Sequence, residues 1–269
     1  IGWIVAGLLI SFAFGWDSQE SIAAGLLKNT FVMTAIASAV LGVFSFTLPK
    51  TPPSAKGEKV AIKDILGLEA LDLLKDRNFL VFFLSSVLIC IPLAFYYQNL
   101  SPFLTESGVE KSTALASIGQ VSEVVFMLLL PFFFKKFGFK KTILVGMLAW
   151  TLRYLLFAYG NTGDLFFMII TGIVLHGICY DFFFVSGQIY TDSKAGPKIK
   201  SAAQGLITLA TYGVGMLVGF YVAGKITDAN IVGEGHDWNS VWVFPAIFAA
   251  AVFVIFALLF KSEKIEYTE

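Results

Sequence analysis

Long apolar segments with almost no charged residues recur along the whole chain and restrict what it can fold into. A helix needs roughly 20 apolar residues to cross a hydrocarbon core about 30 Å thick. Only 14% of the residues are charged, against roughly 25% in soluble domains. The sequence therefore predicts an all-α polytopic membrane protein and argues against a soluble enzyme, a disordered chain and a nucleic-acid binder. The eight predicted spans are residues 1–15, 22–48, 79–104, 113–134, 142–159, 165–190, 202–226 and 239–260.

The basic residues are distributed unevenly among the connections between these spans. Of the nineteen Lys and Arg residues, fifteen lie in four segments, whereas the intervening connections carry three and are otherwise acidic. Cytoplasmic loops of membrane proteins carry the excess of Lys and Arg. The alternation supports eight spans and predicts a cytoplasmic C-terminus. The four basic segments are residues 49–78, 135–141, 191–200 and 261–269.

The longest connection, residues 49–78, divides the chain. It opens with prolines and becomes amphipathic from Val60 to Leu74, as expected for a helix lying at the membrane surface, although a solvated helical linker fits equally well. Residues 1–48 form two spans, residues 79–260 form six, and residues 261–269 form a cytoplasmic tail. A six-span unit behind a long cytoplasmic loop is typical of transporters with two six-helix halves. Because the first span is short and begins at Ile1, we expect it to be a truncated helix preceded by four further spans.

Ionisable side chains inside the spans are costly and mark candidate functional sites. Glu123 lies near the middle of its span, three residues after Gln120, and this spacing puts both side chains on one helix face. Arg153 lies at a similar depth in the next span. His176 and Asp181 lie in the span after that, with Asp181 closer to the cytoplasm.

Each of these residues also has a structural interpretation. Glu123 and Arg153 could form an ion pair that joins two helices, and His176 could be a satisfied interior histidine. We expect Asp181 to belong to a cytoplasmic gate, bonded to the backbone or to a lysine. His176 and Cys179 supply two metal ligands at most, and neither HExxH nor GxSxG occurs, so we expect no metal site and no enzyme.

Two other spans carry polar or small residues in a pattern. The run Phe95–Asn99, which follows Pro92, contains Tyr97 and two amides. These groups need partners inside a membrane and suit a hydroxyl-rich or heterocyclic ligand, although aromatic side chains serve packing more often. In the span 202–226, the spacing of Gly215 and Gly219 favours a close helix contact.

Several short motifs follow one another along the second part of the chain. They are Ser117–Glu123 (SIGQVSE), Pro131–Gly138 (PFFFKKFG), Ala149–Tyr154 (AWTLRY), Phe157–Gly160, His176–Gly177, Tyr180–Phe183 (YDFF), Ser186–Gly187 and Ser201–Gly205 (SAAQG). Taken together in this order, they resemble the nucleoside:proton symporter family of the major facilitator superfamily. The resemblance covers nearly the whole chain and implies spans five to twelve of a twelve-helix fold. It also implies a multi-pass protein of the bacterial inner membrane that imports nucleosides down the proton gradient.

The resemblance also implies site residues. In the family, the Gln and Glu of the GQxSE motif face the central cavity, which points to Gln120 and Glu123 as substrate-binding residues. The sequence departs from the enterobacterial pattern elsewhere. Ala94 and Tyr97 replace a Gln and an Asn in the seventh span.

A second departure lies just before the motif DFF. Here His176 and Tyr180 stand where enterobacterial members carry Tyr and Phe. We expect both residues, together with Tyr97, to contact the substrate.

The leading hypothesis is a proton-coupled secondary transporter that imports nucleosides by alternating access. Glu123 would take up a proton from the outer side and release it inward, with Arg153 balancing its charge. The alternatives are a major facilitator transporter for a sugar or another polar metabolite and, with less support, a non-transporting membrane sensor. We expect a monomer in the lipid bilayer, with a nucleoside or related small polar solute as its partner, no nucleic acid, and no cofactor other than the coupling ion H+.

Overall fold

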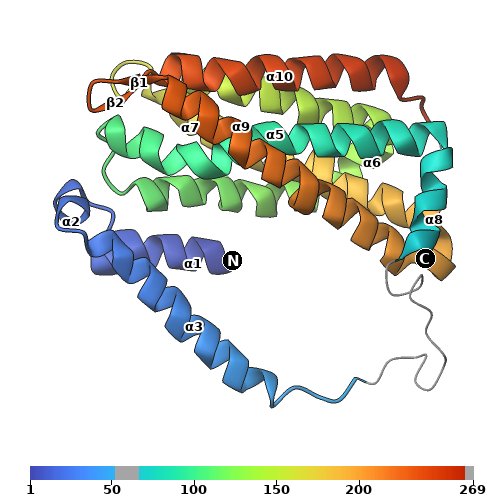
Figure 1. Ribbon diagram of the computed structural model, residues 1–269, viewed down its shortest axis with the longest axis horizontal. Coiled ribbons are helices and arrows are strands. Elements are labelled where there is room, and N and C mark those ends of the chain that lie inside the picture. Colours follow the sequence, from blue (N-terminus) through green and yellow to red (C-terminus); the bar gives the residue numbers. More distant parts are fainter. Residues whose placement is uncertain (52–66, 264–269) are drawn as a thin grey trace.

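The computed structural model describes residues 1–51 and 67–263, and these residues form a bundle of helices with one small β-hairpin (Figure 1). Strands β1 and β2 of the hairpin pair antiparallel, with Ile231 opposite His236. The elements are α1 (Gly2–Leu8), η1 (Leu9–Phe14), α2 (Gln19–Ala23), η2 (Leu26–Lys28), α3 (Asn29–Ser45), η3 (Leu68–Lys75), α5 (Arg77–Glu106), α6 (Ser112–Tyr159), α7 (Phe166–Tyr180), η4 (Asp181–Val185), α8 (Ser186–Thr208), η5 (Leu209–Gly215), α9 (Met216–Ala229), β1 (Ile231–Val232), β2 (Gly235–His236) and α10 (Trp238–Leu259).

Within the described residues, five continuous helical stretches are long and apolar enough to cross a membrane, and a shorter apolar helix covers Gly2–Phe14. Two of the five are too long for one crossing. The 48 residues of α6 would extend about 72 Å, and the 64 residues from Phe166 to Ala229 about 96 Å. Each contains a glycine with left-handed backbone, Gly138 at φ +73° and Gly196 at φ +62°, a conformation that glycine adopts without strain. With a break at each glycine, the described residues hold eight apolar segments, as predicted.

The two halves of α6 lie side by side rather than end to end. Gly119 of the first half and Arg153 of the second half both contact His176 of α7. The chain therefore reverses direction at Gly138, as the ribbon also shows (Figure 1).

The basic connections lie at one end of the bundle, on the right in Figure 1, and polar contacts join them to neighbouring segments. Lys194 forms ion pairs with Asp76 at 3.0 Å and with Glu263 at 2.6 Å. Lys140 donates a hydrogen bond to the carbonyl oxygen of Ala257 at 2.9 Å. The start of α5, the bend in α6, the middle of α8 and the end of α10 therefore meet there, in agreement with the alternating charge pattern.

The opposite end is held by a different set of contacts. Glu106, at the end of α5, accepts hydrogen bonds from Trp238 Nε1 at 2.9 Å and from the backbone N–H of His236 at 3.1 Å. Asn239 donates to the carbonyl oxygen of Ala158 at 2.9 Å. The less basic connections thus lie together, away from the basic ones.

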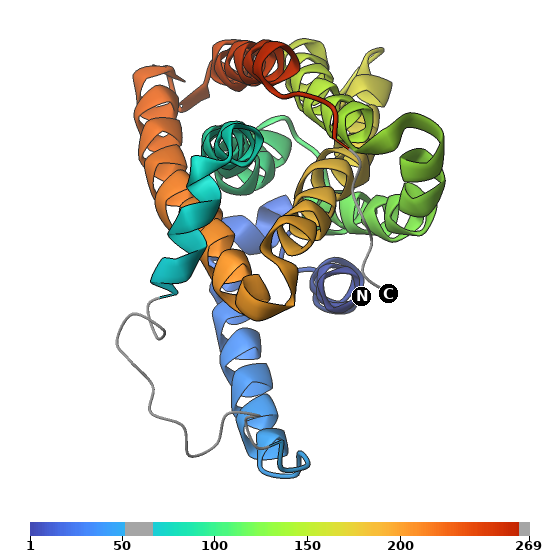
Figure 2. The ribbon, with the colours of Figure 1, turned by 90° about the vertical axis from the view of Figure 1, so that its right-hand side faces the viewer.

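Helix α5 forms the centre of the bundle. Figure 2 shows it enclosed by neighbouring helices on several sides, and most of its apolar core is buried. A Cβ added to Gly215 would lie 2.8 Å from Cys90 Cβ, and one added to Gly219 would lie 2.7 Å from Ala94 Cβ. The close contact predicted from the spacing of these two glycines is confirmed, because only glycine allows this approach to α5.

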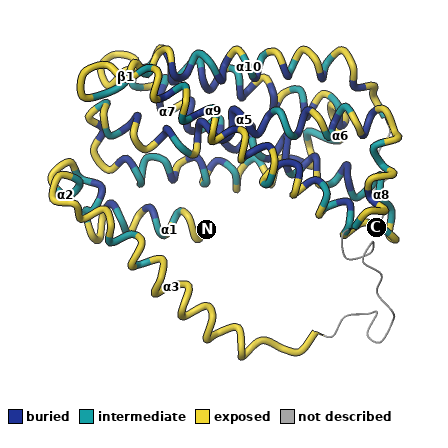
Figure 3. The backbone as a smooth tube through the Cα atoms, in the orientation of Figure 1, coloured by how far each residue is buried: buried dark blue, intermediate teal, exposed yellow. Residues whose placement is uncertain are grey.

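The N-terminal segment joins the bundle through α1 and η1. The side chain of Asp17 accepts hydrogen bonds from Ser11 Oγ at 2.5 Å and from the backbone N–H of Thr113 at 3.0 Å. By contrast, no residue of α3 is buried (Figure 3). Of the predicted amphipathic segment, residues 60–66 lie outside the described residues, and Leu68–Lys75 forms the 3₁₀ helix η3. Its placement at a membrane surface stays a prediction.

Asp76 caps the first turn of α5. Its Oδ1 accepts the backbone N–H of Phe79 at 2.9 Å, and its Oδ2 pairs with Lys194. Partial burial by itself raises the pKa of Asp76, but these hydrogen bonds and the positive charge of Lys194 outweigh it and hold the pKa below its ordinary value. The ionised carboxylate therefore stabilises the folded state.

Replacing the cap, Asp76→Ala, is expected to lower the free energy of unfolding by about 1 kcal/mol at neutral pH, because an N-cap is lost and a half-exposed ion pair adds little. The effect is complete above the unfolded-state pKa of Asp76 and disappears as the pH falls through the lower folded-state value. Thermal unfolding in detergent measures the loss of stability at pH 7 and its disappearance at acid pH. Asp72→Ala, at an exposed position within η3, is the control and should change little. An equal loss in both variants would contradict the capping role.

Candidate functional site

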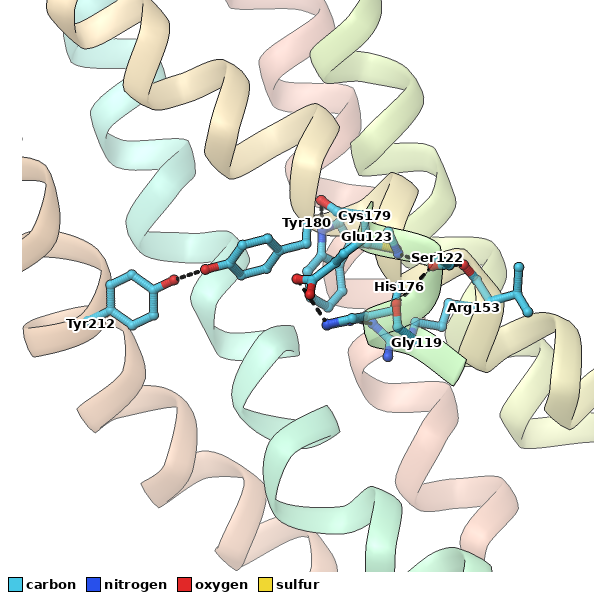
Figure 4. A network of polar contacts seen from close by, with 11 residues as sticks. Gly119, Ser122, Glu123, Arg153, His176, Cys179, Tyr180 and Tyr212 are labelled. Atoms are coloured by element: carbon cyan, nitrogen blue, oxygen red, sulfur yellow. Dashed lines mark hydrogen bonds and ion pairs between the residues drawn. The ribbon is translucent and has the colours of Figure 1, made fainter. Parts of the chain in front are cut away.

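A row of polar side chains crosses the interior of the apolar bundle. Arg153 Nη1 lies 3.0 Å from His176 Nδ1, and His176 Nε2 lies 3.6 Å from Glu123 Oε1. Figure 4 shows these three residues together, with Tyr180 and Tyr212 continuing the row. The three residues come from the two halves of α6 and from α7, so the site depends on the reversal at Gly138.

Arg153 is fully buried, and aromatic rings surround its guanidinium group. Its Cζ lies 3.3 Å from the ring centroid of Tyr96, 5.5 Å from that of Trp150 and 5.7 Å from that of Phe157. Such cation–π contacts stabilise a desolvated cation by roughly 2 kcal/mol. Within the described residues, Nε and Nη2 have no hydrogen-bond partner, whereas Nη1 lies within hydrogen-bond distance of His176.

His176 is also buried and stacks on Tyr96, with ring centroids 4.9 Å apart and an interplanar angle of 19°. Gly119 leaves room for this pair: a Cβ there would lie 3.2 Å from His176 Cβ and 3.3 Å from Tyr96 Oη. The glycine of the GQxSE motif therefore allows the histidine and tyrosine to approach α6 closely.

The serine of the same motif fixes α6 against α7. Ser122 Oγ lies 2.7 Å from the carbonyl oxygen of Val174, to which it can donate, and it accepts the backbone N–H of Gly177 at 2.8 Å. A Cβ on Gly177 would lie 2.5 Å from the backbone carbonyl of Ser122. This contact sets the register that brings Glu123 beside His176.

Glu123 is more exposed than its two buried neighbours, His176 and Arg153. Its side chain is 23% exposed, whereas that of His176 is 1% exposed. The direct ion pair with Arg153 that the sequence left open is not formed within the described residues, since His176 lies between the two groups. The described residues therefore leave part of the carboxylate uncovered, on the side away from Arg153.

Tyr97 and Gln120 lie at a cavity of about 200 Å³ between α1, α5 and α6. Tyr96 lines the same cavity, so this ring is shared between the cavity and the buried histidine. Tyr97 is 42% exposed. These phenols and the amide offer hydrogen bonds and aromatic faces to a ligand.

Tyr180 and Asp181 lie at the junction of α7 with the π-helical turn η4. The Tyr180 hydroxyl is 2.6 Å from that of Tyr212, which links this junction to η5. Asp181 is fully buried, and within the described residues neither of its carboxylate oxygens has a hydrogen-bond partner. The backbone or lysine partner expected for Asp181 is thus not formed there, and its role in gating stays a prediction.

Sequence reasoning missed Tyr96 and Tyr212. The prediction from the run Phe95–Asn99 names Tyr97 and not Tyr96. The prediction for the span 202–226 rests on its glycines and not on Tyr212. The signal that could have found Tyr212 is the phenol itself, because a hydroxyl at membrane depth needs a partner.

Comparison with known proteins identifies the family. Residues 1–265 match the family model described as Nucleoside H+ symporter. In Escherichia coli K12, the chain is 42% identical over all of its length to "Putative nucleoside transporter YegT" and 33% identical over 86% of its length to Xanthosine permease. It spans 64% of the first relative and 59% of the second.

The fold agrees with this match. The crystal structure of nucleoside transporter NupG superposes with a TM-score of 0.75 at 27% identity, covering 97% of this chain and 65% of that one. An aspartate-to-alanine variant of NupG gives a TM-score of 0.79 at 28% identity, with the same coverage. The chain therefore is a multi-pass membrane protein with the major facilitator fold and belongs to the nucleoside H+ symporter family.

Proposed function

We propose that the protein is a proton-coupled secondary transporter that imports nucleosides across the bacterial inner membrane by alternating access. The observation that carries this proposal is the position of Glu123. Its carboxylate lies inside an apolar bundle, is partly exposed on one side and faces a buried histidine–arginine pair on the other. The names of its relatives, which include nucleoside transporters and a xanthosine permease, support the substrate class.

Glu123 carries the coupling proton in this proposal. The apolar surroundings favour its neutral form, while His176 and the positive charge of Arg153 favour its ionised form. A carboxylate balanced in this way can take up a proton on one side of the membrane and release it on the other. Arg153 contributes through its charge without leaving its aromatic surroundings.

The substrate would occupy the cavity beside Tyr96, Tyr97 and Gln120. The amide of Gln120 can both donate and accept hydrogen bonds, which suits ribose hydroxyls or base edges. The half-exposed ring of Tyr97 can stack on a base. Tyr180 would contribute from the Tyr212 side of the row.

The charge pattern orients the transporter. The end of the bundle that gathers Lys140 and Lys194 would face the cytoplasm, together with the C-terminus. We propose that the protein is a monomer. We propose that it uses no cofactor, apart from the proton as coupling ion. The six helices of residues 79–260 would rock against the other half of the transporter around the site.

Competition for uptake separates this proposal from transport of a sugar. Cells expressing the full-length protein are given a labelled nucleoside under an imposed inward proton gradient. We expect accumulation that unlabelled nucleosides suppress and sugars do not. Suppression by sugars alone would favour the sugar alternative, and binding of nucleoside without accumulation would favour a membrane sensor.

A further inference from the structure

We propose that Arg153 is a positioning residue that fixes His176 as its neutral Nε2–H tautomer. The histidine then presents a single hydrogen-bond donor, the Nε2–H group. The Glu123 carboxylate and an acceptor group of the substrate bind this donor in turn. The tautomer follows from geometry alone. Its use in transport rests on the proposed function. The two parts are therefore tested separately.

The tautomer follows from what each atom can do. A guanidinium group has five N–H donors and no acceptor, and it stays protonated in proteins. Its contact with His176 Nδ1 at 3.0 Å is a hydrogen bond only if Nδ1 carries a lone pair. A proton on Nδ1 would point at the N–H group of Arg153, and two donors cannot form a hydrogen bond with each other. The neutral ring must then carry its proton on Nε2, the atom that faces Glu123.

The surroundings hold this arrangement in place. Tyr96 packs against both partners, on the guanidinium at 3.3 Å and on the imidazole at 4.9 Å. Arg153 and His176 are each almost completely buried, so water does not compete for the Nδ1 lone pair. The ring therefore cannot turn over without breaking a buried, charge-assisted hydrogen bond, which is among the stronger kinds.

The Nε2–H donor faces Glu123 without being fully engaged by it. The distance of 3.6 Å is within reach of an electrostatic contact but longer than a hydrogen bond. When Glu123 is ionised, its carboxylate is the strongest acceptor near this donor. When Glu123 takes up a proton, that proton adds to the carboxylate oxygen and His176 gives up none of its own. The donor then becomes available to a carbonyl oxygen, hydroxyl or ring nitrogen of the substrate.

The titratable groups around His176 come from three elements. Tyr96 comes from α5, Glu123 and Arg153 from the two halves of α6, and Tyr180 from α7, with its ring centroid 5.9 Å from that of His176. Of these, Glu123 is the one that changes charge near neutral pH in this proposal. The imidazole stays neutral throughout. Its Nε2–H donor binds the Glu123 carboxylate when Glu123 is ionised and is free for the substrate when Glu123 is protonated.

Nitrogen NMR of protein labelled at histidine tests the tautomer directly. The chain has two histidines. The variant His236→Gln, in the β-hairpin where His236 pairs with Glu106, identifies the signals of His176 without altering the site. We expect one neutral tautomer at pH 7, with a bare Nδ1 and a protonated Nε2. A protonated Nδ1 or a charged imidazolium in the wild-type protein would overturn the assignment, whatever the transport measurements give.

Arginine variants test the positioning role. Arg153→Gln supplies an amide that can donate or accept, so we expect mixed tautomers and a KM for nucleoside raised about five- to tenfold, as for one lost hydrogen bond. Arg153→Lys, which can only donate, should restore the single tautomer and most of the affinity. Arg77→Gln, at the other arginine of the chain, is the matched control.

The outcomes of this series are distinguishable. If Arg153→Gln keeps both the single tautomer and the wild-type KM, the positioning role is wrong. If the tautomer changes but the KM does not, the coupling part is wrong and the tautomer assignment stands. If wild-type protein with the expected tautomer transports no nucleoside, the proposed function fails independently of the assignment.

Discussion

Glu123→Gln is expected to abolish proton-driven accumulation of nucleoside while leaving nucleoside exchange across the membrane. Glutamine keeps the size and hydrogen-bonding capacity of the side chain but cannot bind or release a proton. Because Glu123 is the partly exposed carboxylate beside His176, its loss should remove coupling and leave the binding contacts of Tyr97 and Gln120 in place. The internal concentration should then equal the external one instead of exceeding it severalfold.

Two measurements on the same preparation test this expectation. Uptake under an imposed proton gradient reports coupling, and exchange of labelled for unlabelled nucleoside without a gradient reports binding and alternating access. Glu110→Gln, in the connection between α5 and α6, is the matched control and should accumulate nucleoside like the wild-type protein. A Glu123→Gln variant that still accumulates nucleoside fully would show that another group carries the proton.

Gly177→Ala is expected to give the largest loss of stability among single substitutions near the site. An added Cβ would lie 2.5 Å from the backbone carbonyl carbon and oxygen of Ser122, and backbone atoms cannot move aside as a flexible side chain can. Helices α6 and α7 would have to separate, and the hydrogen bond from the Gly177 N–H to Ser122 Oγ would weaken. Overpacking of this kind costs about 3 kcal/mol.

Thermal unfolding in detergent measures this loss as a lowered midpoint and a smaller folded fraction. Gly42→Ala in α3 is the matched control, because a Cβ there meets no atom within 4 Å. It should leave the free energy of unfolding unchanged or raise it by up to about 1 kcal/mol, because alanine favours a helix more than glycine does. If Gly177→Ala unfolded at the same temperature as the control, the contact between Ser122 and Gly177 would not be the one that holds α6 against α7.

The number of spans and their alternation between the two ends of the bundle could be predicted from the sequence, because both depend on composition along the chain. Apolar length sets each crossing, and the alternating basic connections assign successive connections to opposite ends. Which end faces the cytoplasm stays a prediction. The two breaks in long helices fall at Gly138 and Gly196, inside the basic connections where the apolar runs had already indicated an end. The apolar runs and the positions of basic residues along the sequence are sufficient to predict this part of the fold.

The arrangement of the site could not be predicted in the same way, because it depends on how each helix is rotated about its axis. A helix that is apolar on all sides gives no amphipathic signal for this rotation. Tyr96 and Tyr97 are neighbours in the chain, yet Tyr96 is 3% exposed beneath Arg153 and Tyr97 is 42% exposed at the cavity. For the same reason, Glu123 and Arg153 could be placed at one depth, but the insertion of His176 between them could not be foreseen.

Proton movement that accompanies the substrate is the most direct test of coupling. A nucleoside is added to lightly buffered, de-energised cells that express the full-length protein, and the external pH is recorded. Proton-coupled import predicts a transient rise of external pH on addition of nucleoside, none on addition of a sugar, and none in the Glu123→Gln variant. Entry of nucleoside without a change of pH in wild-type cells would contradict proton coupling.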